Sequence, residues 1–258
     1  MIYTVTFNPA LDYVMNLKQL QYKDINRTES EQLYYGGKGI NVSVILSRLK
    51  VDNIALGFLA GFSGKKIEEM LNAENIKNDF VYLKKGYTRI NVKIKADEDY
   101  DINAQGPDIE LDELNALFDK FEKLKSGDFL VLAGSIPNSL PDDIYEEILA
   151  KLQNKGINFA VDATGDLLLN VLKYKPFLIK PNHHELGDVF GVEVKTEKEI
   201  AYYAKKLQEM GARNVLVSRS KDGATLVDEF GEVHSMGNVP GKVLNLSLIH
   251  ISEPTRLG

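Results

Sequence analysis

Short apolar strand patterns alternate with amphipathic helix patterns along most of this chain, and this alternation limits the folds open to it. Strand patterns recur at residues 2–7, 53–60, 77–83, 128–133, 159–162, 178–180 and 214–218. Helix patterns with an apolar stripe lie between them, at residues 39–49, 64–73, 112–124, 141–153, 166–172 and 197–210. Buried strands separated by helices are typical of a parallel sheet with helices on both faces. The sequence therefore predicts an α/β fold.

Two segments depart from this alternation. Residues 12–35 are polar and irregularly β-like, and residues 88–105 hold an alternating strand followed by an acidic turn. Half-buried alternation suits an antiparallel flap better than a core strand. We expect both segments to form a small β lid over the mouth of the sheet.

The composition excludes several classes of protein. The 258 residues include 31 Lys and Arg against 37 Asp and Glu, a formal net charge of −6, whereas a general nucleic-acid binder needs a basic face. Cys is absent, which excludes disulfides and thiolate metal sites. The chain has no signal-peptide pattern and no apolar run near the roughly 18 residues of a membrane helix. We expect a cytoplasmic enzyme or small-molecule binder.

A glycine-rich segment leads directly into the first helix pattern. It reads Gly36-Gly37-Lys38-Gly39-Ile40-Asn41-Val42-Ser43. Glycines let the backbone approach a ligand closely, a helix N-terminus favours an anion, and Lys38 adds a full positive charge. The segment fits neither a P-loop nor a dinucleotide pattern. We predict that it binds an anion; the alternative is a turn with a solvated lysine.

Polar residues also accompany two strands of the first half. Asp12 comes soon after the first strand, at the edge where open α/β sheets bind ligands, and it could hold sugar hydroxyls or belong to a plain turn. Arg89, Asn91 and Lys93 alternate along a strand and share one face. Two cations and an amide on one face suit a phosphate, although a solvated outer face has the same pattern.

Turns after later strands carry further candidates. Ser135 follows a buried strand and presents a hydroxyl at the carboxyl edge of the sheet. Asn182 and Glu185 share one side of a helix if one begins there, and an amide and a carboxylate can hold the water shell of Mg²⁺. Residues 218–223 could wrap a nucleotide or form a hairpin turn.

The adjacent pair His183 and His184 raises the question of a zinc site. Neighbouring residues point about 100° apart on a helix, Cys is absent, and no other His is close in sequence. We expect these histidines to be polar surface residues.

Taken in this order, the motifs resemble the ribokinase-like sugar kinases of the phosphofructokinase-B family, and most closely its bacterial 1-phosphofructokinases. The resemblance covers residues 1–245 and is most specific at residues 6–12, 36–43, 88–93, 132–137 and 180–185. It implies a three-layer α/β/α sandwich with a mostly parallel central sheet, in one domain over residues 1–245. Residues 12–35 and 88–105 would form the lid.

The resemblance also implies a role for each candidate. The residues implied at the sugar phosphate are Asp12, Gly37, Lys38, Asn41, Arg89, Asn91, Lys93 and Ser135. Those implied at ATP are Lys180, Asn182, Ser218 and Gly223, and Glu185 would orient Mg²⁺ through water. The implied reaction is phosphoryl transfer from MgATP to the C6 hydroxyl of fructose 1-phosphate, giving fructose 1,6-bisphosphate.

Other functions stay open beside this one. A tagatose 6-phosphate kinase would share the scaffold, and a non-catalytic fragment could bind a sugar phosphate without turnover. A dinucleotide-dependent oxidoreductase is disfavoured because no Gly-x-Gly-x-x-Gly follows the first strand. We expect no nucleic-acid or membrane partner, and the lid could pair two copies into a homodimer.

The end of the sequence differs from the family. Residues 246–258 resemble a translated sequencing adaptor, and we expect a non-native tail. After Asn245 the family continues into a Gly-Ala-Gly-Asp motif, which supplies an anion hole and the catalytic Asp, whereas this chain has Leu246-Ser247-Leu248-Ile249. We therefore expect an incomplete domain with poor solubility, no catalytic Asp and little or no turnover.

Overall fold

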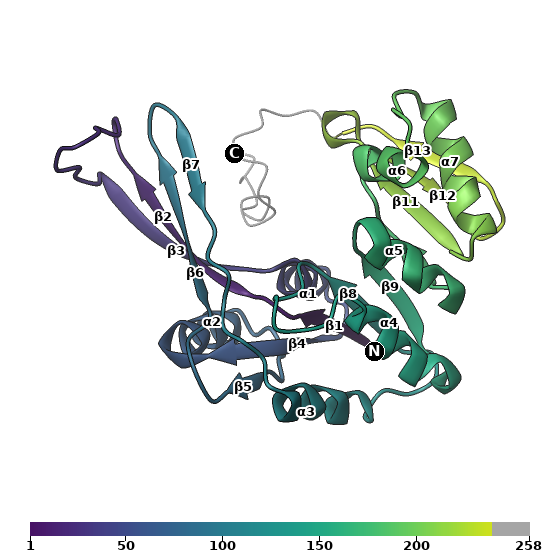
Figure 1. Ribbon diagram of the computed structural model, residues 1–258, viewed down its shortest axis with the longest axis horizontal. Helices are drawn as coiled ribbons and strands as arrows, with labels where there is room; N and C mark the ends of the chain where they lie inside the picture. Colours follow the sequence, from purple (N-terminus) through teal and green to yellow (C-terminus); the bar gives the residue numbers. More distant parts are fainter. Residues whose placement is uncertain (239–258) are drawn as a thin grey trace. The chain divides into compact units, whose positions relative to one another are not determined.

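The computed structural model describes residues 1–238, and the chain divides into two compact units (Figure 1). The N-terminal unit comprises residues 4–122 and 135–140. The C-terminal unit comprises residues 1–3, 123–134 and 141–238 of the described chain. Each unit is an α/β body of its own, and the expectation of one domain over residues 1–245 stays a prediction.

Parallel strands and helices form the base of the N-terminal unit. Its elements are the end of β1 (Ile2–Thr6), α1 (Lys38–Arg48), β4 (Asn53–Ala60), α2 (Gly61–Ala73), β5 (Val81–Leu83) and α3 (Leu111–Phe121). Strand β4 lies between β1 and β5 and runs parallel to β5. Leu59, Ile67 and Leu71 are fully buried between β4 and α2, which shows that the apolar stripe of α2 faces the sheet.

The lid segments form a separate four-stranded sheet in this unit, drawn as long arrows in Figure 1. Its strands are β2 (Ala10–Asn16), β3 (Ser30–Gly36), β6 (Arg89–Lys95) and β7 (Asp99–Ile102), in the order β3-β2-β6-β7. The expected lid strands are present, but the sheet is not wholly antiparallel, because β2 and β6 run parallel. The chain between them passes through α1, β4 and α2, and such a long crossover permits a parallel pair.

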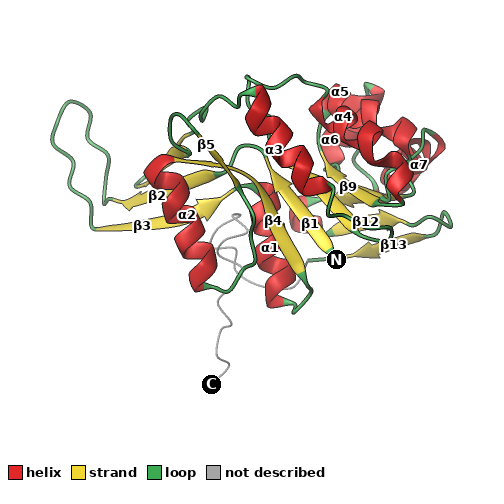
Figure 2. Cartoon of the chain, turned by 90° about the horizontal axis from the view of Figure 1, so that it is seen from below, coloured by secondary structure: helices red, strands yellow, loops and turns green. Residues whose placement is uncertain are grey.

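The C-terminal unit places helices along a second set of strands, and Figure 2 shows α4 to α7 gathered beside β9, β12 and β13. The parallel strands are β8 (Phe129–Ala133), β9 (Asn158–Asp162), β10 (Leu178–Ile179) and β11 (Asn214–Ser218). The helices are α4 (Ile144–Leu152), α5 (Gly165–Val171), α6 (His183–Phe190) and α7 (Glu197–Glu209). No helix of the described residues is long and apolar enough to cross a membrane.

An antiparallel hairpin that the sequence patterns did not predict completes this unit. Strands β12 (Ala224–Val227) and β13 (Val233–Met236) follow β11, and β13 is exposed along its whole length. An exposed edge strand needs no apolar face, so its sequence carries no clear period.

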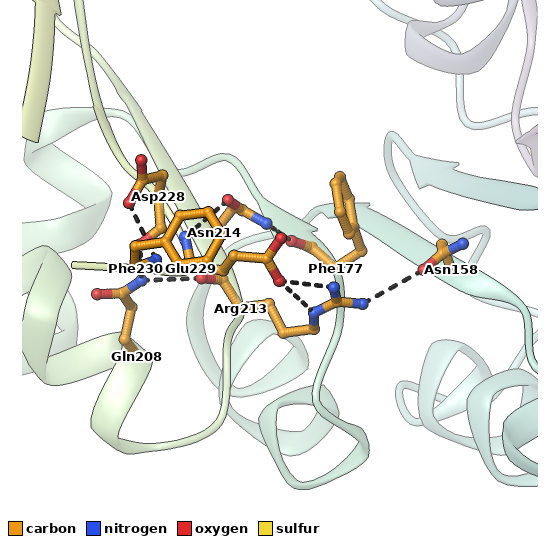
Figure 3. Close-up of polar contacts among 8 residues, drawn as sticks. All are labelled: Asn158, Phe177, Gln208, Arg213, Asn214, Asp228, Glu229 and Phe230. Atoms are coloured by element: carbon orange, nitrogen blue, oxygen red, sulfur yellow. Dashed lines mark hydrogen bonds and ion pairs between the residues drawn. The ribbon is translucent and has the colours of Figure 1, made fainter. Parts of the chain in front are cut away.

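A polar network holds the hairpin turn to the start of β11 (Figure 3). The guanidinium of Arg213 donates to Glu229 at 2.6 and 3.1 Å, reaches Asn158 Oδ1 at 3.4 Å, and stacks 5.1 Å from the ring centroid of Phe177. These contacts connect the turn after β12 to the starts of β9, β10 and β11. The starts of these parallel strands lie at the edge of the sheet opposite to their carboxyl ends.

Two other elements differ from the sequence-based prediction. Helix α2 begins at Gly61 rather than residue 64, and β5 covers only Val81–Leu83 instead of residues 77–83. Residue Asn78 makes an isolated bridge to Ala55, which indicates that the chain approaches β4 before a regular ladder forms.

Candidate functional site

The carboxylate of Asp12 and the amide of Asn91 meet on the polar face of the lid sheet. The register of β2 and β6 places the two residues directly opposite each other. Asn91 Nδ2 donates to Asp12 Oδ1 at 2.8 Å, and both side chains are buried. A buried carboxylate needs such a donor to offset its desolvation. Distant segments thus combine into one polar centre.

Two cations lie on the same face of β6, as the alternation predicted. Lys93 Nζ is 3.8 Å from Asp12 Oδ2 and 3.6 Å from Asp101. Arg89 Nη1 donates to Ala104 O at 3.4 Å, while its buried Nε has no hydrogen-bond partner among the described residues. Burial lowers the pKa of Arg89, and the Asp12 carboxylate opposes that shift. The Nε of Arg89 could therefore donate to an acceptor atom of a ligand.

Arg89 and Ser135 both line a pocket of about 200 Å³ within the N-terminal unit. The lining residues are Asn8, Arg89, Ala104, Gln105, Gly106, Pro107, Asp108, Ser135, Ile136, Pro137 and Asn138. The pocket is therefore formed by Asn8, which follows β1, by the lid strand β6, by residues 104–108, which follow the lid, and by the turn at residues 135–138. It has the size of a small polar ligand and contains one guanidinium group.

Sequence reasoning did not identify Asn8 as a site residue, although it lines this pocket. Asn8 Nδ2 donates to Gln105 O at 2.8 Å. Asn91 Oδ1 accepts from Ala104 N at 3.2 Å. These two amides fix the backbone of one wall of the pocket. An Asn-Pro dipeptide is a common turn signal, so this pattern alone does not indicate the contact.

The glycine-rich segment lies where β3 passes into α1. Gly37 is the N-cap of α1 with φ 126°, a conformation that side chains disfavour. Lys38 is exposed on the first residue of the helix, and Asn41 is half-buried one turn later. A Cβ on Gly36 would lie 3.3 Å from Asp12 Oδ2, so the loop passes directly beside the carboxylate.

The expected nucleotide residues all lie in the C-terminal unit, at the carboxyl ends of its strands. Lys180 follows β10, and its Nζ is 3.4 Å from Asp162 Oδ1 at the end of β9. Asp162 was not singled out in the sequence, although it is the last residue of β9, at the edge where open α/β sheets bind ligands. The pair provides a cation and a carboxylate on adjacent strand ends.

Asn182 and Glu185 form a capping box at the start of α6. Asn182 Oδ1 accepts from the amides of His184 and Glu185, and Glu185 Oε2 accepts from the amide of Asn182 at 2.8 Å. The two side chains do lie together at a helix start, as the spacing predicted. Their mutual hydrogen bonds also give them a structural role.

The histidine pair lies on the first turn of α6. His183 is half-buried and His184 is exposed, and their ring centroids are 3.9 Å apart. Within the described residues the one group with metal-ligand spacing is Asp228, Glu232 and His234, on the exposed β12–β13 hairpin. Asp228 Oδ1 already accepts from two amides of that turn, so these contacts account for its position.

The segment from Ser218 to Gly223 lies beside this capping box. Asn182 and Ser218 form a parallel bridge, and Ser218 N donates to Pro181 O at 3.1 Å. Arg219, which sequence reasoning did not select, is largely buried, and its Nε has no hydrogen-bond partner among the described residues. The hairpin interpretation of this segment is confirmed, since the segment joins β11 to the antiparallel β12.

Residues 246–258 lie outside the described part of the chain. The expectations of a non-native tail and of a missing Gly-Ala-Gly-Asp motif therefore stay predictions.

Comparison with known proteins gives the family. A model of the pfkB family carbohydrate kinases matches residues 5–245. The 1-phosphofructokinase of Bacillus subtilis is 45% identical over 246 residues, which are 95% of this chain and 80% of that protein. The D-tagatose-1-phosphate kinase of Bacillus licheniformis is 38% identical over the same shares of the two chains.

A solved structure agrees with these relatives. The tetrameric inhibited form of phosphofructokinase-2 from Escherichia coli matches with a TM-score of 0.85 and 27% identity, covering 93% of this chain and 80% of that chain. The fold is thus the ribokinase-like α/β fold with a mostly parallel sheet. The chain belongs to the pfkB family of carbohydrate kinases and is a sugar-phosphate kinase by its relatives.

Proposed function

We propose that the sugar site of this chain takes fructose 1-phosphate, and that the reaction this site serves in the kinase is transfer of the γ-phosphoryl group of ATP to the C6 hydroxyl. The observation that carries the proposal is the buried Asp12–Asn91 pair with Arg89 beside it, next to a pocket. The guanidinium Nε of Arg89 has no acceptor among residues 1–238. A carboxylate and an amide are suited to sugar hydroxyls, and a guanidinium is suited to a phosphate. The name of the Bacillus subtilis relative supports this substrate.

The sugar phosphate would be held by residues of the N-terminal unit. Asp12 and Asn41 would bind hydroxyls, and Gly37 and Lys38 would border the sugar through backbone and charge. Arg89, Asn91 and Lys93 would bind the existing phosphate, and Ser135 would line the site. Phosphoryl transfer depends mainly on positioning and charge neutralisation, and the cations Lys38, Arg89 and Lys93 suit it.

The nucleotide would be held by residues of the C-terminal unit. Lys180, Asn182, Ser218 and Gly223 come from adjacent strand ends and would contact ATP. Asp162 and Glu185 present carboxylate oxygens, the donors that Mg²⁺ prefers, and Glu185 would act through water. Bound Mg²⁺ would neutralise charge on the phosphates of ATP. In the transfer, a general base takes the proton of the C6 hydroxyl, and the resemblance implies that this base is the Asp of the Gly-Ala-Gly-Asp motif that the family has after the position of Asn245. The C6 oxygen bonds to the γ-phosphorus while the bond from that phosphorus to the β–γ bridging oxygen breaks, and ADP leaves.

A second substrate deserves comparison because of the Bacillus licheniformis relative, which is named for tagatose 1-phosphate. Fructose and tagatose derivatives carry similar hydroxyls and can carry the same phosphate, so the polar groups in the pocket would suit both. The tagatose 6-phosphate alternative and the non-catalytic binding fragment also stay open. A cytoplasmic location is part of the proposal, because ATP is supplied there.

Isothermal titration of fructose 1-phosphate against the purified chain tests the proposal. We expect Arg89→Leu to weaken binding by about 10- to 100-fold, the effect of losing a charge-assisted hydrogen bond. Arg48→Leu is the matched control, because it removes a guanidinium at the last residue of α1, at the opposite end of that helix from Gly37 and Lys38. There Arg48 pairs with Glu74 at 3.3 Å. Equal binding of fructose and fructose 1-phosphate, or no effect of Arg89→Leu, would contradict the proposal.

The same samples separate the alternatives. Parallel titrations with tagatose 1-phosphate and tagatose 6-phosphate rank the substrates. A coupled assay for ADP release with MgATP distinguishes turnover from binding alone. Tight binding without ADP release favours the non-catalytic fragment expected from the sequence after residue 245.

We also propose that the lid sheet pairs two copies of the chain. Strand register puts Tyr13, Leu33, Val92 and Ile102 in one row, on the face opposite to Asp12 and Asn91. Leu33 and Ile102 are 40% and 59% exposed, so this apolar row has free surface. Such surface on the outer part of a lid is suited to the same surface of a second copy.

A further inference from the structure

Helix α1 begins beside the sugar site without a capping side chain of its own. Its N-cap is Gly37, which has no side chain to accept a hydrogen bond, and its first turn holds no acidic residue. The first amides of a helix need acceptors, and Ser, Thr, Asp or Asn at the N-cap usually supplies one. The glycine loop that would border the sugar therefore depends on another element for its position.

Thr6, at the end of β1, supplies the missing acceptor. Its Oγ1 accepts from the amide of Ile40 at 2.9 Å, and the side chain is buried. The methyl and hydroxyl groups of Thr6 also occupy the space that a Cβ atom would need at Gly37 and at Gly39. A Cβ on Gly37 would lie 2.6 Å from Thr6 Cγ2, and one on Gly39 would lie 2.5 Å from Thr6 Oγ1. One side chain thus fixes both the helix start and the loop before it.

We infer that Thr6 is a positioning residue for sugar-phosphate binding, acting through the glycine loop rather than by contact with the ligand. The inference rests on the proposed function. If the loop borders the sugar, a shift of the first turn of α1 moves Lys38 and Gly37 relative to Asp12, whose carboxylate lies beside Gly36. Small displacements in a preorganised site reduce affinity without removing any ligand contact.

The chain contains a matched control two residues earlier on the same strand. Thr4 Oγ1 and Ser43 Oγ are 2.8 Å apart, and both side chains are fully buried. This bond also joins β1 to α1, but it lies one turn further from the glycine loop. Thr4→Val therefore removes a comparable buried hydrogen bond without freeing the helix start.

The test compares Thr6→Val, Thr6→Ser and Thr4→Val by titration with fructose 1-phosphate and by amide hydrogen exchange. We expect Thr6→Val to weaken binding about tenfold, the effect of one net hydrogen bond, whereas Thr6→Ser keeps the acceptor and stays within about twofold of the parent. Thr4→Val should lower the melting temperature as Thr6→Val does, yet leave the affinity within about twofold. Exchange of the Ile40 amide should accelerate only in Thr6→Val.

Two results overturn the inference: equal affinity losses for Thr4→Val and Thr6→Val, or unchanged exchange of the Ile40 amide in Thr6→Val. A parent chain that binds no sugar phosphate would instead refute the proposed function. In that case the exchange measurement still decides whether Thr6 holds the start of α1.

Discussion

At the scale of single residues, the polar centre of the lid consists of a few side chains that depend on one another. Asn91 uses both ends of its amide, donating to Asp12 Oδ1 and accepting from Ala104 N. Asp12 in turn keeps its buried carboxylate beside Lys93. A buried carboxylate that lost its donor would be destabilised by its desolvation cost, so the identity of residue 91 matters more than its size.

Replacing Asn91 by Asp tests this dependence. The variant keeps the acceptor for Ala104 N but places a second carboxylate where the donor to Asp12 was, at a distance of 2.8 Å in the parent. Two carboxylates this close cannot both ionise freely, so the pKa of one rises above its unfolded value. We expect Asn91→Asp to lose about 1–3 kcal/mol of unfolding free energy near pH 7.

The sign of the pH dependence follows from the raised pKa. The folded variant binds more protons than the unfolded chain between about pH 7 and pH 5, so its stability relative to the parent rises as the pH falls through this range. Urea unfolding at both pH values measures this. Asn103→Asp makes the same charge change on an exposed residue nearby and should show neither effect. Identical behaviour of the two variants would contradict the prediction.

At the scale of elements, β1 and β4 approach each other more closely than ordinary side chains permit. Gly57 lies within β4 with φ 139°, and a Cβ there would lie 2.0 Å from Thr6 O. The same strand end carries the hydroxyl that caps α1. A glycine in a strand interior usually weakens the strand, and here the close backbone contact explains it.

We expect Gly57→Ala to cost more than about 3 kcal/mol of unfolding free energy, because both the backbone conformation and the contact with Thr6 O must change. Gly191→Ala separates these two causes. Gly191 ends α6 with φ 65° and has open space around a Cβ, so only the conformational cost of about 1–2 kcal/mol applies. Denaturant unfolding of both variants measures the difference between these two free-energy losses. Insolubility of Gly57→Ala alone would also agree with the larger loss. Equal losses would show that the close contact is unimportant.

At the scale of the whole molecule, local periodicity predicted the elements but not their partners. Alternation alone put Arg89, Asn91 and Lys93 on one face of a strand, and the structure places them so. The pairing of Asn91 with Asp12 depends on the register between strands far apart in sequence, which no local pattern contains. The acceptor role of Thr6 and the contact of Asp162 with Lys180 were missed for the same reason.

The register between strands also determines which side chains gather on each face of the lid sheet. Asp12, Asn91 and Lys93 occupy the polar face, whereas Leu33 and Ile102 share the opposite face. Nearer α1 and α2, that second face is buried through Leu11 and Tyr35. Further from these helices the apolar side chains of the same face, such as Leu33 and Ile102, are exposed. The apolar face is therefore larger than the part that the core of a single chain covers.

If this outer surface pairs two copies, a charge within it should separate them. We expect the chain to sediment as a dimer at tens of micromolar and Ile102→Asp to shift it to monomer, because a buried unpaired carboxylate costs several kcal/mol in an interface. Leu111→Asp is the control, since Leu111 is 74% exposed on the first turn of α3, away from the lid sheet. Unfolding curves for both variants show whether the fold is retained. A monomeric parent, or a dimer that survives Ile102→Asp, would rule out pairing through this face, and the apolar row would then need another partner.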